Sequence, residues 1–204
     1  MRPLAGLVIA YLAGSIPFAY LAGKLFKGID LREHGSGNLG ATNVFRVMGW
    51  KIATLVMVLD MAKGALPVLL LPPRLVQSHP ELWAIAFGVA AIVGHVRSVF
   101  LLWKGGGKGV ATAGGVFLAL APIASPISIA VFAAVVYLSG YVSLGSLCSA
   151  VVLTVAVVLT KGLGSPVAIA CALITVFVFW THRANIARLR RGEENRFRRA
   201  RPAS

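Results

Sequence analysis

The chain has 204 residues, of which 58% are hydrophobic and only 13% are charged. This composition and a mean hydropathy of +0.84 exclude most soluble folds, because a soluble domain carries charge on roughly a quarter of its residues. The 20 basic and 6 acidic residues give a net charge of +14. In a soluble protein, such an excess of positive charge would suggest nucleic-acid binding. In an integral membrane protein it indicates the orientation of the chain in the bilayer.

A membrane-spanning helix needs about 20 apolar residues, and the apolar runs predict seven of them. In chain order the runs cover 4–26, 52–71, 82–95, 110–121, 126–140, 144–160 and 166–181. The third and fourth runs are short, so broken spans or a re-entrant pair are alternatives. The first run exceeds the apolar region of a signal peptide, about 7 to 15 residues. We therefore predict an all-α integral membrane protein with seven transmembrane helices, in a single membrane domain, 1–204.

The basic residues predict the orientation of these spans. Seven spans place most of them on one side, in the segments 24–51, 97–108 and 183–201. Because cytoplasmic loops carry the excess of Lys and Arg, we expect the N-terminus outside and the C-terminus in the cytoplasm. If the third and fourth runs were a re-entrant pair, the basic segment 104–108 would lie outside. The excess of positive charge on cytoplasmic loops argues against this placement. The basic tail from about residue 182 lacks a stacking platform of aromatic residues, which favours contact with anionic lipid over nucleic acid.

The first candidate segment is a glycine-rich stretch on the expected cytoplasmic side, residues 34–43, HGSGNLGATN. Its glycines have GxGxxG spacing, but no strands alternate with helices around them, so a dinucleotide fold is not supported. Glycines let backbone amides approach an anion closely, although an ordinary polar loop is the alternative. The polar residues that accompany them are Ser36, Asn38, Thr42, Asn43 and Arg46. The combination favours a phosphate-binding loop.

The second candidate segment lies within residues 94–115, where Lys104 and Lys108 flank three consecutive glycines. It is not a Walker A motif, because Leu102 and Gly109 stand where that motif needs a glycine and a Ser or Thr. ATP hydrolysis is therefore not expected. A glycine hinge between helices is the alternative, but a hinge does not require lysines, so phosphate binding is favoured.

Other polar residues stand near or within the predicted helices. His182 and Asn185 share a helix face, although a histidine at a membrane boundary is more often an interfacial residue than a catalyst. Asp60 and Lys63 can face each other in the second predicted helix, where a structural ion pair and a functional site are both plausible. The four histidines form no metal-ligand pattern, and the two cysteines have no CxxC spacing. We expect no metal, no cofactor and no disulfide framework.

Three segments together resemble the signature motifs of the bacterial acyl-phosphate:glycerol-3-phosphate acyltransferase family. They are SGNLGATN at 36–43, GHVRSVFLLWKGGGKGVAT at 94–112 and HRANIARLRRGEE at 182–194. The resemblance implies a seven-helix fold in the bacterial inner membrane, with its N-terminus outside and its active site on the cytoplasmic side. It implies transfer of a fatty acyl group from acyl phosphate to the 1-hydroxyl of glycerol 3-phosphate, which yields lysophosphatidate for phospholipid synthesis.

The resemblance also implies roles for individual residues. The expected catalytic residues are Ser36, Arg46, Lys108, Ser143, His182 and Asn185. The expected substrate-binding residues are Gly37, Asn38, Gly40, Thr42, Asn43, Lys104, Gly105, Gly106, Gly107, Gly109 and Arg188. Glu194 is expected to hold the tail in place. Two departures stand out: the glycine run is one residue longer than usual, and Thr181 replaces an arginine, for which Arg183 is a candidate substitute.

The expected partners are glycerol 3-phosphate, a long-chain acyl phosphate and membrane lipids, with a monomeric protein and no nucleic acid. An acyltransferase that uses acyl-CoA or acyl carrier protein is one alternative, but none of the four histidines is followed five residues later by Asp. A membrane transporter for phosphate esters is a second alternative. A structural protein tied to anionic lipids by its tail is a third.

Overall fold

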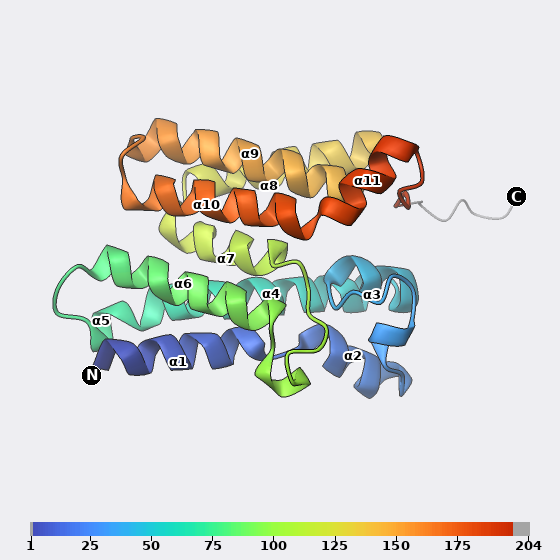
Figure 1. The fold of residues 1–204 in the computed structure, drawn as a ribbon, viewed down its shortest axis with the longest axis horizontal. Helices are drawn as coiled ribbons and strands as arrows, with labels where there is room; N and C mark the ends of the chain where they lie inside the picture. The colour runs from blue at the N-terminus through green and yellow to red at the C-terminus, as the bar shows by residue number, and fades with distance from the viewer. Residues whose placement is uncertain (1, 198–204) are drawn as a thin grey trace, which may run out of the picture. The chain divides into compact units, whose positions relative to one another are not determined.

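The computed structural model describes residues 2–197 and contains only helices, turns and loops in that range. The α-helices are α1 (Arg2–Ser15), α2 (Phe18–Lys27), α3 (Ala41–Met48), α4 (Trp50–Leu70), α5 (Pro72–Leu75), α6 (Pro80–Val96), α7 (Val110–Leu120), α8 (Ala124–Ser139), α9 (Val142–Lys161), α10 (Pro166–Thr181) and α11 (Arg183–Arg191) (Figure 1). Two short 3-10 helices are η1 (Leu31–Glu33) and η2 (Val99–Leu101). The tail arginines Arg198, Arg199 and Arg201 lie outside the described residues. The predicted all-α class is confirmed.

Each of the seven predicted runs is helical over most of its length, but the first run is not one helix. The chain leaves the helix after Ser15 and resumes it at Phe18, so α1 and α2 are separate. Pro17 accounts for the break, because proline lacks a backbone N–H and disfavours helical geometry in the residue before it. The amphipathic helix α3 was not predicted, since its eight residues are far fewer than a span requires.

The described residues form four helical segments that are long and apolar enough to cross a membrane. They are Arg2–Lys27, Trp50–Leu75, Pro80–Leu101 and Val142–Lys161. A fifth is present if α10 and α11, which meet at a bend of 58°, are counted as one span. The helices α7 and α8 are apolar but shorter, with 11 and 16 residues. The chain is thus a multi-pass membrane protein with four or five candidate spans by length.

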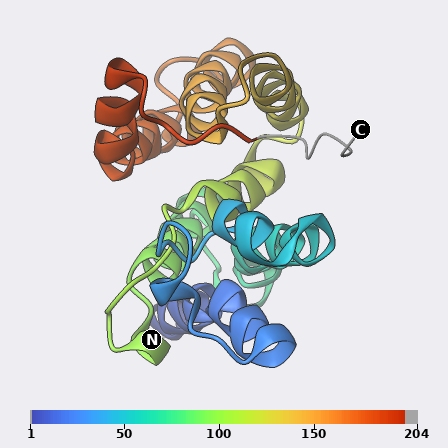
Figure 2. The ribbon, with the colours of Figure 1, turned by 90° about the vertical axis from the view of Figure 1, so that its right-hand side faces the viewer.

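The helices divide into two compact units, Met1–Leu120 and Ala121–Ser204. In the first unit, α1 packs on α6 and α4 packs on α7 (Figures 1 and 2). Both helix pairs meet at glycines, where no side chain separates the two backbones. A Cβ at Gly14 would overlap the backbone of Ala91, and a Cβ at Gly115 would overlap the backbone of Met61. Close backbone approach at small residues is how membrane helices gain packing energy where apolar burial gives none.

The second unit contains α8 to α11, and buried or half-buried hydroxyl groups make hydrogen bonds between its helices. Ser128 Oγ on α8 donates to the carbonyl oxygen of Ser149 on α9 at 2.8 Å. The hydroxyls of Thr154 on α9 and Thr175 on α10 lie 2.8 Å apart. Such bonds contribute about 0.6 kcal/mol each between membrane helices, and they fix α8 and α10 against α9.

Candidate active site

The first glycine segment, 34–43, connects η1 to α3 in the first unit. Gly35 and Gly37 have φ values of 63° and 69°, a left-handed conformation that glycine adopts without strain. The side chain of Asn43 lies inside the loop: its Oδ1 accepts a hydrogen bond from the Ser36 N–H at 2.8 Å, and its Nδ2 donates to the His34 carbonyl at 2.9 Å. Asn43 is 1% exposed. The amide therefore holds the loop in shape from within.

The polar side chains of this segment differ in their exposure. Ser36 and Arg46 are exposed, whereas Asn38 and Thr42 are half-buried. Gly40 caps the N-terminus of α3, and Arg46 lies in the last turn of that helix. No carboxylate of residues 2–197 lies within ion-pair distance of Arg46. Its guanidinium is available for a ligand phosphate, which it can hold by two parallel hydrogen bonds.

The second glycine segment, residues 104–109, is an irregular loop that leads directly into α7. Gly105 and Gly109 have φ values of 78° and 83°, and the Gly109 carbonyl accepts the N–H of Ala113 at 2.8 Å. Lys104 is exposed and Lys108 is half-buried. A glycine loop at a helix N-terminus presents backbone N–H groups to an anion. The loop geometry is compatible with the predicted phosphate binding, which itself stays a prediction.

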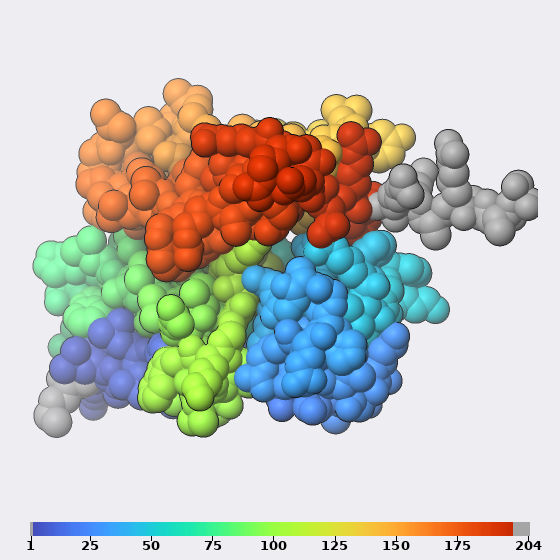
Figure 3. Space-filling model, turned by 45° about the vertical axis from the view of Figure 1, so that its right-hand side comes forward, coloured from blue at the N-terminus to red at the C-terminus, as the bar shows by residue number. Residues whose placement is uncertain are grey.

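Arg32 joins the two glycine segments. Its Nη1 donates to the Lys104 carbonyl at 3.4 Å, and η1, which carries it, leads into the first segment. Figure 3 shows the two segments side by side, the first in blue and the second in yellow-green. The Arg32 guanidinium pairs with Asp30 at 2.6 Å. Its hydrogen bonds lower the pKa of that carboxyl to about 2, so Asp30 is charged at neutral pH.

The second unit contains a separate polar cluster around Glu194. Its Oε1 accepts hydrogen bonds from Ser143 Oγ at 2.9 Å and from Asn185 Nδ2 at 2.6 Å, and its Oε2 accepts one from Arg188 Nε at 2.7 Å. Burial would raise the pKa of Glu194, but the bonds from Asn185, Arg188 and Ser143 outweigh burial and lower it. The carboxylate thus ties the start of α9 to α11.

His182 ends α10 and is 3% exposed. Its Nδ1 lies 2.8 Å from the carbonyl oxygen of Val178, so Nδ1 must carry the proton and donate it. In the neutral ring the lone pair is then on Nε2. The neighbouring Arg183 rests its guanidinium over the ring of Trp180 at 4.8 Å and donates to the carbonyl of that residue. This is where the structure places the candidate substitute for the arginine that Thr181 replaces.

The structure brings the predicted residues together within each unit. In the first unit, Arg32, just before the first segment, contacts Lys104, and Leu39 of that segment lines the same cavity as Gly106 and Gly107. In the second unit, Ser143, Asn185 and Arg188 converge on Glu194. The predicted contact of Asp60 and Lys63 is confirmed, with Lys63 Nζ 2.6 Å from Asp60 Oδ1.

Sequence reasoning missed three contacts that the structure shows. It did not predict the bridge made by Arg32, the convergence of three residues on Glu194, or the approach of His95 to Asp60 at 3.6 Å. One signal could have pointed to them: the chain has only six acidic residues, so each acid within a basic segment or an apolar helix indicates a specific partner.

Comparison with protein families gives one match over most of the chain. The model of a family described as "Glycerol-3-phosphate acyltransferase" matches residues 4–192. A relative of the same name from Maridesulfovibrio salexigens is 48% identical over 189 residues, which cover 93% of this chain and 94% of that protein. Another from Geobacillus kaustophilus is 48% identical over 183 residues, covering 90% of each chain.

Two solved structures are similar to this chain along nearly its whole length. Both are crystal structures of PlsY, described as an integral membrane glycerol 3-phosphate acyltransferase. The glycerol 3-phosphate form has a TM-score of 0.87 and 37% identity, and it covers 97% of this chain and 96% of that one. The lysophosphatidic acid form has a TM-score of 0.84 and 36% identity, with coverage of 96% and 95%.

Proposed function

This chain belongs to the glycerol-3-phosphate acyltransferase family, and we propose that it transfers a fatty acyl group from acyl phosphate to the 1-hydroxyl of glycerol 3-phosphate. The products are lysophosphatidate and inorganic phosphate, at an early step of phospholipid synthesis. The observation that carries the proposal is the adjacency of two glycine segments suited to phosphate, one followed by Arg46 and one containing Lys108. The solved relative described in a glycerol 3-phosphate form supports the choice of acceptor.

Acyl phosphate suits these residues as a donor. It is a mixed anhydride and is already activated, so the transfer needs neither ATP nor a metal. Both substrates then carry a phosphate, and the repulsion between two anions in a partly dehydrated site must be offset by fixed positive charge and backbone donors. Arg46, Lys104, Lys108 and the amides of the loop 105–109 are the groups that we assign to this task.

We assign different tasks to the other predicted residues. Ser36, Asn38 and Thr42 donate hydrogen bonds to a substrate, while Gly37, Gly40 and Asn43 hold the first loop in shape. His182 and Asn185 are assigned to orienting the glycerol hydroxyl, as the resemblance to the family implies. Ser143 and Arg188 act with them and are held by Glu194.

The proposed reaction is a single acyl transfer. The 1-oxygen of glycerol 3-phosphate attacks the acyl carbonyl carbon, the bond between that carbon and the phosphate oxygen breaks, and inorganic phosphate leaves. The hydroxyl proton passes to a phosphate oxygen, so His182 positions the acceptor and is not the obligatory base. Holding the hydroxyl near the carbonyl supplies much of the rate, since effective molarities of about 10⁵ M or more are reached in favourable cases.

We further propose how the protein lies in the cell. Seven helices cross the bacterial inner membrane, with α7 and α8 as short spans, the N-terminus outside and the active site on the cytoplasmic side. Residues 1–204 are a single membrane domain, and the protein works as a monomer. The basic residues after 182 contact anionic lipid headgroups. The excess of Lys and Arg in the segments 24–51, 97–108 and 183–201 supports this orientation.

The experiment is an assay of phosphate release and lysophosphatidate formation by the purified protein in lipid vesicles. Glycerol 3-phosphate is supplied with either palmitoyl phosphate or palmitoyl-CoA. We expect turnover with the acyl phosphate alone, and a loss of at least about 100-fold in Arg46→Ala, the size expected when a donor to transition-state charge is removed. Lys51→Ala is the matched control, because Lys51 is also an exposed cation of the first unit.

Two results would count against the proposal. Turnover with palmitoyl-CoA alone would assign a different donor. No turnover with either donor, in a protein that still binds glycerol 3-phosphate, would indicate a transporter of phosphate esters.

A further inference from the structure

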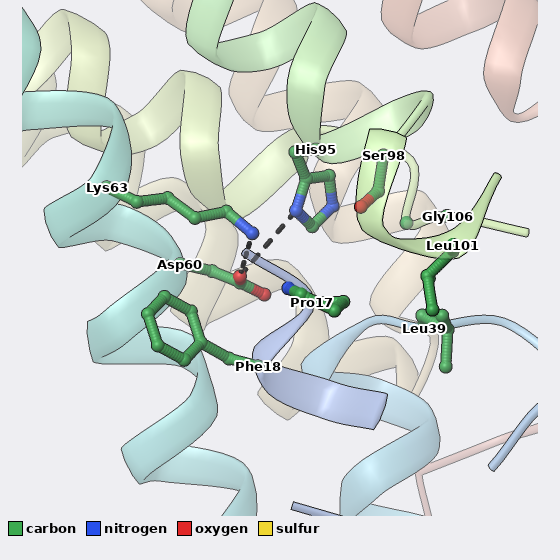
Figure 4. A pocket seen from close by; sticks show the side chains of 10 residues that line it. Pro17, Phe18, Leu39, Asp60, Lys63, His95, Ser98, Leu101 and Gly106 are labelled. Carbon is green, nitrogen blue, oxygen red and sulfur yellow. Dashed lines mark ion pairs between the residues drawn. The ribbon is translucent and has the colours of Figure 1, made fainter. Parts of the chain in front are cut away.

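Three ionisable side chains that the proposed reaction does not use are buried together in the first unit. Asp60 and Lys63 come from α4 and His95 from the end of α6, and all three are at most 7% exposed. They line a cavity of about 10 Å³ that Gly106 and Gly107 of the second glycine segment also line (Figure 4). A buried charge is costly to keep in a membrane protein, and it is usually kept for function.

The three groups are arranged around the Asp60 carboxylate. Lys63 Nζ lies 2.6 Å from Asp60 Oδ1, and His95 Nδ1 lies 3.6 Å from the same oxygen (Figure 4). Lys63 also donates to the Ile16 carbonyl at 2.8 Å, at the break between α1 and α2. Lys63 therefore balances the charge of Asp60, and the carboxylate in turn attracts the Nδ1 edge of the imidazole. Although 3.6 Å is too long for a direct hydrogen bond, the field of a buried carboxylate is strong at that distance.

The opposite edge of the His95 ring faces the second glycine segment. A Cβ at Gly107 would overlap His95 Nε2, and a Cβ at Gly106 would overlap the carbonyl oxygen of Val96. The backbone of the loop thus rests directly on the imidazole and on the last turn of α6. Gly107 does not have a positive φ, so contact with His95, and not backbone strain, is what requires a glycine there.

We propose that His95, oriented by Asp60, is a positioning residue for the phosphate-binding loop of residues 104–109. Contact with the imidazole ring fixes the distance of the Gly106–Gly107 backbone from the end of α6. This in turn fixes the orientation of the Lys108 side chain and of the backbone N–H groups at the start of α7. The ligand of this loop is the phosphate group of one of the two substrates. The inference rests on the proposed function for its ligand, but the contact between ring and loop can be tested without turnover.

The loop positioning can be measured by hydrogen exchange on the full-length protein in lipid vesicles, followed for peptides that cover 104–110. We expect faster exchange in His95→Ala and near wild-type exchange in His95→Gln, which keeps a polar side chain of similar length beneath the loop. Thr175→Val is the control, because it removes a half-buried hydroxyl contact of the second unit and should leave the loop unchanged. Unchanged exchange of 104–110 in His95→Ala would overturn the proposal.

A double-variant cycle tests the contact in the working enzyme. Gly107→Ala places a methyl group into the His95 ring, so we expect kcat/KM to fall on the order of 100-fold, as when catalytic groups are displaced by about 1 Å. In the His95→Ala background the methyl group has room, and we expect the same substitution to cost less than about threefold, a strong non-additivity between contacting residues. Additive losses would refute the contact.

The kinetic constants separate positioning from general damage. If His95 positions the loop, His95→Ala raises the KM of a phosphorylated substrate about tenfold or more, with a smaller fall in kcat. Varying glycerol 3-phosphate and palmitoyl phosphate in turn identifies which phosphate the loop holds. An unchanged KM for both substrates would refute the inference. A wild-type protein without transferase activity would refute only the proposed function, since the exchange measurement would still report on the loop.

Discussion

Replacing Glu194 by Gln tests the cluster that holds α11 to α9. The carboxylate accepts three hydrogen bonds, from Ser143, Asn185 and Arg188. Glutamine keeps one acceptor oxygen for the first two, but its NH₂ group faces the Arg188 guanidinium, so the charge-assisted bond is lost. Bonds to charged groups contribute about 1.5–3 kcal/mol. Because the Arg188 side chain is 37% exposed, solvent screening reduces this, and we expect a destabilisation of about 2 kcal/mol.

The assay is thermal unfolding of the purified protein in detergent at neutral pH. A loss of about 2 kcal/mol corresponds to a fall in Tm of about 4–8 °C for a chain of this size. Glu193→Gln is the matched control. The Glu193 carboxylate pairs with Arg191 at 2.7 Å, but both side chains are more than half exposed, and exposed ion pairs contribute little to stability. A difference in Tm of about 1 °C corresponds to at most about 0.5 kcal/mol for a chain of this size. If the Tm values of Glu194→Gln and Glu193→Gln differ by less than about 1 °C, the reasoning is refuted.

The same carboxylate predicts a dependence of stability on pH. The pKa of Glu194 is lower in the folded protein than its usual value, which is about 4.3 in the unfolded chain. The folded state therefore gains stability from the ionised form above that unfolded pKa and loses it as the pH falls through the lower, folded pKa. We expect Tm to fall below about pH 4.3 in the wild type, and to fall less steeply in Glu194→Gln. Parallel curves would contradict the assignment.

Three further substitutions have definite expected outcomes. Asn43→Ala removes the amide that bonds the part-buried Ser36 N–H and His34 carbonyl and the buried Leu31 carbonyl. Leaving a buried group unsatisfied costs about 1–3 kcal/mol, which unfolding measurements would detect and an unchanged Tm would contradict. Arg46→Lys keeps the charge but loses the two-pronged geometry, so steady-state assays should show a KM raised about tenfold and not wild-type kinetics. His182→Asn should retain measurable turnover if the residue positions the acceptor, whereas complete loss with intact binding of glycerol 3-phosphate would identify a general base.

The sequence predicted the helices well, because the length and hydropathy of a span are local properties. The run at 166–181 and the helix α10 have the same bounds. The glycine segments were predicted as irregular loops and are irregular, with positive φ at Gly35, Gly37, Gly105 and Gly109, whereas their binding of an anion stays a prediction. Asp60 and Lys63 were predicted to meet because residues three apart lie on one helix face, and their 2.6 Å distance confirms it.

What the sequence could not predict are contacts between residues far apart in the chain. Arg32 and Lys104 are separated by 72 positions, and Ser143 and Glu194 by 51. Their meeting depends on how helices pack, and hydropathy contains no information about packing partners. The same reason hid the role of His95: a histidine at the end of an apolar helix gave no indication that it supports a loop, which became evident only from its contact with Gly107.

The balance of charge explains why the few acidic residues matter in this protein. With 20 basic and 6 acidic residues, most cations cannot be neutralised by the protein's own carboxylates. Asp30, Asp60 and Glu194 each pair with a basic residue that lies in or beside a site segment, namely Arg32, Lys63 and Arg188. Arg46 pairs with no carboxylate in the described part of the chain. Carboxylates thus fix the framework, while a cation within the proposed site keeps its charge for substrates that are themselves anions.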